Sequence, residues 1–226
     1  MRATTAPRVT GPRPAPKGRK PKTATRVAVS VLGALLGLAG IEHGIGEILQ
    51  GPARPEDPFI LSWPEASAVE ILSGEPAMTV IPNLLVTGIL AVAVALVVVI
   101  WSIWFVGSPH GGLVLIALSV LLLLVGGGFG PPLMGVIVGV AATRIGASSA
   151  RPPGRLARVI GMGWPWILTA AVLGYLALMP GMVLASHFLG MADAALVAAL
   201  TAFAFTALVV ALVAARAHDR ARLQTS

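Results

Sequence analysis

The sequence predicts an all-α fold, a polytopic transmembrane helix bundle of about six membrane segments with cytoplasmic N- and C-termini. Two observations on composition predict it: the mean hydropathy is +0.88, and only 11% of the residues are charged. A soluble domain would carry roughly 25% charged residues, because its surface must be wetted. The third observation is a series of apolar segments that reach the roughly 20 residues a helix needs to cross the hydrocarbon core. The 226 residues therefore fit one membrane domain and leave no room for a separate soluble domain.

The N-terminal segment 1–26 is expected to be a disordered, basic cytoplasmic tail. It contains eight basic residues, five prolines and no acidic residue. Basic residues beside a first membrane helix fix its orientation and contact anionic lipid headgroups, so nucleic acid is not expected as a partner. The apolar segment that follows is longer than the roughly 7–15 residues of a signal-peptide core, which indicates an uncleaved signal anchor.

The predicted transmembrane helical domain covers residues 27–216. Four of its apolar segments are uninterrupted and lie at about 27–49, 83–106, 163–185 and 192–215. An external loop is expected at about 50–82, where acidic residues outnumber basic ones. A cytoplasmic C-terminal tail is expected at 217–226.

One further apolar region, 111–146, is broken near its centre by a run of turn-forming residues: Gly126, Gly127, Gly128, Gly130, Pro131 and Pro132. A single crossing would place the four arginines between 144 and 158 outside, against the positive-inside rule. If the chain doubles back, 15 of the 16 basic residues lie on the cytoplasmic side. We therefore expect a hairpin, either of two full crossings or of a re-entrant pair whose irregular backbone lines a cavity.

The first membrane segment contains a predicted packing seam and the ionisable residues that are least expected within a membrane helix. At 100° per residue, four glycines fall on one face and form a seam for close helix approach: Gly33, Gly37, Gly40 and Gly44. Glu42, His43 and Glu47 follow in its outer half, where ionisable groups usually face protein or water. Two interpretations remain open. Either His43 and Glu47 form an i,i+4 pair, or Glu42, His43, Glu47 and His187 form a proton- or ligand-binding site beside an outward-facing cavity.

A second group of polarisable side chains lies near the outer end of the fifth segment, where Pro180 predicts a kink. It consists of Met179, Met182, His187 and Met191, and thioethers with an imidazole can bind Cu(I). Methionine in apolar helices is more often filler, so no cofactor is predicted, and haem or copper is the weaker alternative. No zinc-protease, nucleophile-elbow or Walker A motif occurs, and nothing else indicates an enzyme.

Three stretches resemble an uncharacterised family of prokaryotic multi-pass membrane proteins. They read GIEHGIGEILQ at 40–50, LSGEPAMTVIPN at 72–83 and VGGGFGPPLMG at 125–135. The resemblance covers roughly residues 30–146. It implies an integral protein of a prokaryotic plasma (inner) membrane, and it assigns no activity.

These observations favour a small-solute or ion transporter or channel-like protein, coupled to protons through the polar residues of the first segment. The alternative is a non-catalytic scaffold, assembly factor or regulatory subunit. In that case the glycine seam would pack against another membrane protein or a second copy of the chain.

Overall fold

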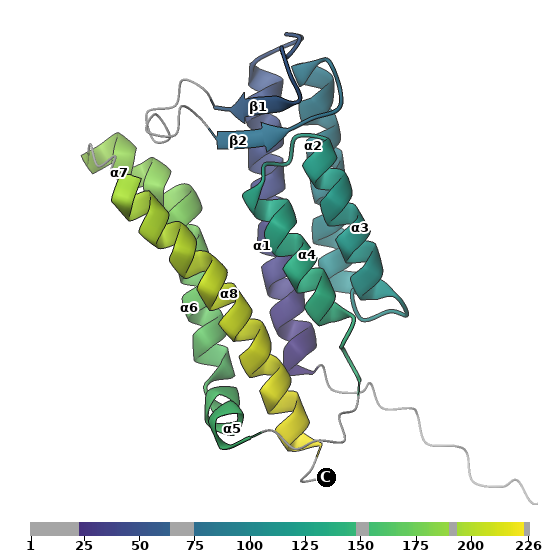
Figure 1. The fold of residues 1–226 in the computed structure, drawn as a ribbon, viewed down its shortest axis with the longest axis vertical. Helices are drawn as coiled ribbons and strands as arrows, with labels where there is room; N and C mark the ends of the chain where they lie inside the picture. The colour runs from purple at the N-terminus through teal and green to yellow at the C-terminus, as the bar shows by residue number, and fades with distance from the viewer. Residues whose placement is uncertain (1–22, 64–74, 148–153, 190–193, 224–226) are drawn as a thin grey trace, which may run out of the picture.

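The computed structural model describes residues 23–63, 75–147, 154–189 and 194–223 (Figure 1). Four of its helices are long and apolar enough to cross a membrane. They are α1 (Ala24–Leu49), α2 (Leu84–Ile100) with its π-helical continuation η2 (Trp101–Phe105), α6 (Trp164–Leu176) with η3 (Ala177–Gly181), and α8 (Ala194–Arg222). The predicted helical membrane fold is thereby confirmed in its coarser form. Most of the predicted basic tail lies outside the described residues.

The region interrupted by glycine and proline doubles back as two antiparallel helices, α3 (Gly111–Leu124) and α4 (Gly130–Ala142). With 14 and 13 residues, these helices rise about 21 and 20 Å. The chain enters α3 near the start of α1, where a Cβ built on Gly107 would lie 3.0 Å from the Arg26 guanidinium. It turns into α4 beside His43. The hairpin thus follows α1 over 17 residues, or about 25 Å.

The glycine seam of α1 is filled by other helices of the same chain. A Cβ built on any of the four seam glycines would approach an atom of α2, η2 or α3 within 3 Å. At Gly37 and Gly44 the neighbours include backbone oxygens, those of Ala95 at 2.9 Å and Gly88 at 2.8 Å. Backbone contact of this kind needs glycine. Since α2 and α3 cover these glycines, the seam is not available to a separate partner.

A small antiparallel hairpin, which the sequence analysis did not predict, lies within the expected external loop. Strand β1 (Phe59–Ser62) pairs with β2 (Glu75–Met78), so that Ser62 stands opposite Glu75. It lies at the end of the bundle where α1 finishes (Figure 1). The backbone N–H of Val80 donates to the Leu124 carbonyl at 3.0 Å, which ties the hairpin to the end of α3.

At the other end of the bundle, the last helix holds the start of the first. Both carboxylate oxygens of Asp219 in α8 accept hydrogen bonds at 2.8 Å, one from the Ala24 amide and one from the Thr25 amide. Helix α8 continues to Arg222, so most of the expected C-terminal tail is helical. The short helix α5 (Arg155–Met162) packs on α8 at this end, whereas α7 (Met182–Leu189) lies at the opposite end.

Candidate functional site

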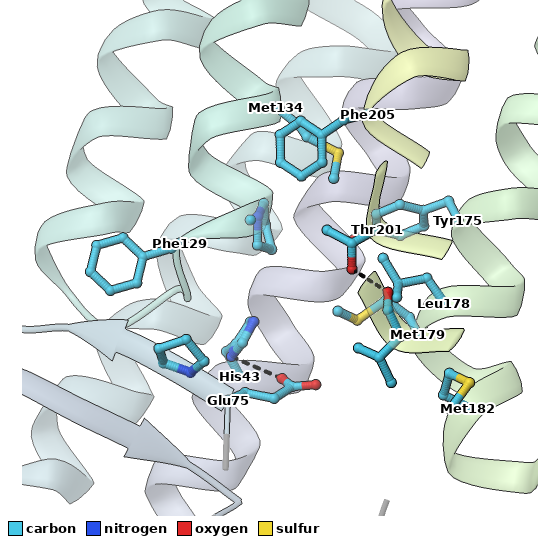
Figure 2. Close-up of a pocket in the computed structure, with 14 residues that line it drawn as sticks. His43, Glu75, Phe129, Met134, Tyr175, Leu178, Met179, Met182, Thr201 and Phe205 are labelled. Carbon is cyan, nitrogen blue, oxygen red and sulfur yellow. Dashed lines mark hydrogen bonds and ion pairs between the residues drawn. The ribbon is translucent and has the colours of Figure 1, made fainter. Parts of the chain in front are cut away.

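Three ionisable side chains meet where α1 passes beneath the β-hairpin, and we call them the polar cluster: Glu42, His43 and Glu75. Each offers one nitrogen or oxygen atom within 4.8 Å of the others. His43 Nδ1 lies 3.2 Å from Glu75 Oε2, and the histidine side chain is only 5% exposed (Figure 2). The helix supplies two adjacent groups, and β2 brings the third from above.

The glycine-rich turn between α3 and α4 forms one wall of this region. Gly126 and Gly128 adopt φ angles of +91° and +75°, which disfavour any residue with a Cβ. A Cβ on Gly128 would collide with the ring of His43, and one on Gly126 with the carboxyl of Glu47. These glycines are therefore required both by their backbone conformation and by the close approach of α1.

Glu47 does not pair with His43, as one interpretation of the sequence proposed. The Ser62 hydroxyl donates to Glu47 Oε1 at 3.3 Å, and both residues are fully buried. Each strand of the hairpin supplies one partner: β1 supplies the partner of Glu47, and β2 supplies the partner of His43. An i,i+4 spacing on the helix allows a pair, but these strands offer each side chain a nearer partner.

Two apolar cavities adjoin the polar cluster, one between α4 and the helices α6 to α8 and the other between α1 and α6 with η3. The first has a volume of about 180 Å³ and is lined by His43, and the second has a volume of about 280 Å³ and is lined by Glu42. Both are lined by Glu75, Tyr175 and Met179. Pockets for drug-sized ligands usually measure roughly 300–1,000 Å³, so these cavities suit ions or small solutes.

Tyr175 is the second functional candidate that the sequence analysis missed, besides Glu75. It is 7% exposed, and its hydroxyl has no hydrogen-bond partner among the described residues. It lies across the cavity from His43 and Glu75 (Figure 2). A buried hydroxyl costs free energy unless it finds a partner, so Tyr175 could bind whatever enters the cavity. The available signal was that Tyr175 is the only tyrosine of the chain.

The methionines predicted near the end of the fifth segment are partly accounted for. Met179 and Met182 line the cavity that contains His43, together with Met134 of α4. The side chain of His187 and the whole of Met191 lie outside the described residues, so their predicted roles are not addressed. Pro180 lies within the π-helical turn η3, as expected for a local break in the helix.

Burial changes the acid–base chemistry of the carboxyl that the hairpin contributes. Burial raises the pKa of Glu75 above its ordinary value of 4.5, although a hydrogen bond with Glu42 acts in the opposite direction. Two neighbouring carboxyls of this kind can share one proton. The same set, with two carboxylate oxygens and one imidazole nitrogen, could also hold a divalent metal ion such as Zn²⁺. Chemically, the cluster can exchange a proton or bind a small cation.

Comparison with protein-family models, with curated proteins and with solved structures finds no match for this chain. The stretch 40–50 contributes Glu42 and His43 of the polar cluster, 72–83 contributes Glu75 and β2, and 125–135 contributes the glycine-rich turn.

Proposed function

We propose that this chain is a small-solute or ion transporter that is coupled to protons through the polar cluster. The observation that carries the proposal is the position of Glu75, which contacts His43 and lines both cavities. Glu75 approaches Glu42 and His43, and ionisable groups within a membrane helix such as these two are costly and usually serve an ion or proton pathway. A change in the protonation of Glu75 would alter the polarity of both cavities at once, which is the coupling a proton-driven carrier needs.

The proposed topology has six crossings, with α3 and α4 as the third and fourth, and both termini in the cytoplasm of a prokaryote. The charge distribution supports it. Every described basic residue except Arg54 lies at the end of the bundle where α1 begins. In the plasma membrane, an excess of arginine marks the cytoplasmic side. The polar cluster would then lie in the outer half of the bilayer, beneath a hairpin that faces the exterior.

The proposal can be tested with purified protein in liposomes that contain a trapped pH-sensitive dye. A step in external pH should produce proton entry that depends on the protein, and Glu75→Gln and His43→Gln should reduce the entry to the rate of protein-free vesicles. A panel of labelled small cations and solutes, applied with and without the pH gradient, would then identify the substrate.

Glu56→Gln is the matched control, because it removes the same charge from an exposed position in the same loop. It should leave proton entry unchanged. Wild-type flux in both cluster variants would refute the proposal, as would equal losses in the cluster variants and the control. Circular dichroism and gel filtration establish that each variant is folded before its flux is compared.

A second candidate function is binding of a soft metal ion such as Cu(I). It is favoured by the three methionines that line the cavity with His43, since thioethers and imidazole are the ligands that Cu(I) prefers. Copper bound by the wild-type protein and lost in Met182→Leu, with proton flux unchanged in the Glu75 variant, would favour this function over the first.

A further inference from the structure

A third cavity, of about 610 Å³, lies at the opposite end of the bundle from the polar cluster. The start of α1, the end of α4 and the last turns of α8 surround it. We call it the arginine cavity, because four arginines line it: Arg144, Arg216, Arg220 and Arg222. We propose that it binds the phosphate group of an anionic lipid headgroup.

The acidic side chains of the described residues balance only part of this charge. Among the described residues, Asp219 is the one acidic side chain that lines the cavity, and both of its oxygens already accept hydrogen bonds from the first amides of α1. From residue 76 onward, the sequence contains one other acidic residue, Asp193.

The guanidinium groups also have hydrogen-bond donors that the described residues do not satisfy. Arg216 uses Nη1 to donate to the Arg144 carbonyl at 3.0 Å, and this neutral acceptor does not balance its charge. The Nε of Arg220 is buried and has no hydrogen-bond partner among the described residues. A guanidinium group presents its N–H donors in a planar fork that matches two oxygens of a phosphate. Neighbouring like charges repel each other, so a bound phosphate would relieve a cost that the fold otherwise bears.

The residues around the cavity indicate that it lies at the level of the lipid headgroups. Gly161 of α5 packs against Ala217 of α8, next to the arginines. On its outer surface α5 exposes three large apolar residues together with two arginines, a composition typical of helices that lie in the membrane interface: Leu156, Val159, Met162, Arg155 and Arg158. Trp164, of a residue type enriched at this depth, lines the cavity as well. Basic pockets between membrane helices at the cytoplasmic surface are known to bind acidic headgroups.

The test uses the full chain in a neutral detergent, with phosphatidylglycerol, phosphatidylcholine or inorganic phosphate added separately. Lipid retention is measured by native mass spectrometry, and thermal stability is measured in parallel. We expect phosphatidylglycerol to bind in preference to phosphatidylcholine. Arg220→Gln and Arg144→Gln should each weaken that binding about fivefold, equivalent to roughly 1 kcal/mol per arginine near a headgroup.

Arg144→Gln is included because its carbonyl, and not its side chain, accepts the bond from Arg216, so that the fold is unaffected. Arg54→Gln is the matched control, since it removes an exposed arginine that lies away from the cavity and should retain full binding. Equal affinity for the two lipids, or equal losses in the cavity and control variants, would overturn the proposal. If inorganic phosphate displaces phosphatidylglycerol and stabilises the protein equally well, the phosphate chemistry holds, but a lipid as its source is refuted.

Discussion

Replacing Gly128 by alanine tests whether the glycine-rich turn fixes the position of His43. The substitution has two separable effects. The φ angle of +75° costs an L-residue about 1–2 kcal/mol wherever it occurs. The added Cβ would also lie 2.5 Å from His43 Cδ2 and 2.7 Å from Cε1, far inside ordinary van der Waals contact. Overpacking of this kind typically costs a further 1–3 kcal/mol.

Gly51→Ala is the matched control. Gly51 has nearly the same φ angle, +73°, but a Cβ there would meet no atom within 4 Å. It should therefore lose only the conformational part, about 1–2 kcal/mol, whereas Gly128→Ala should lose about 2–5 kcal/mol. Denaturant titration in mixed micelles measures both free energies of unfolding.

The difference between the two variants isolates the contact with His43. A displaced imidazole should also move away from Glu75, so Gly128→Ala should impair proton entry in liposomes while Gly51→Ala retains it. If the two free energies agree within about 0.5 kcal/mol, the turn does not confine the histidine and this reasoning is refuted.

Three further predictions concern packing, helix capping and pH. Gly44→Ala should lower the free energy of unfolding by about 1–3 kcal/mol in the same titration, because the added Cβ presses on the Gly88 carbonyl. Gly130→Ala, where the added Cβ meets open space, should change it by less than about 0.5 kcal/mol, and equal effects of the two substitutions would contradict the contact. Asp219→Asn should cost about 1–2 kcal/mol by weakening the cap on α1, seen as a lower thermal midpoint, and a wild-type midpoint would count against that role. The pKa of Glu75 is raised on folding, so Glu75 binds protons more tightly in the folded state, and the stability that it contributes falls as the pH rises from 4.5 through that raised pKa. Glu75→Gln should remove this part of the dependence of stability on pH, and an unchanged dependence would refute the prediction.

The helical membrane architecture could be predicted because hydrophobic length and arginine placement are local properties of the chain. The doubling back at 126–132 followed from charge together with a run of turn formers. The β-hairpin was not predicted. Its strands are four residues each, a length that is marginal for an isolated hairpin, and they pack against α1 and α3.

The polar residues of the candidate site were only half visible in the sequence. Glu42 and His43 stood out because a charge within an apolar helix is unusual, whereas Glu75 was one acid among several in a polar loop. Which acid reaches the helix depends on strand register, and register is a tertiary property. The sequence left open whether Glu47 pairs with His43, and for the same reason it did not indicate Ser62, which approaches Glu47 from a strand that the sequence did not reveal.

The two hydrogen bonds that Asp219 accepts from the start of α1 have a consequence for biogenesis. The two amides that it satisfies are made near the beginning of synthesis, and their acceptor is made 195 and 194 residues later. Until then, the N-terminus of the first helix carries donors that only water or headgroups can satisfy. The bundle therefore closes last at the end where α1 begins, and a chain that stops short of residue 219 would leave an open seam that membrane proteases could recognise.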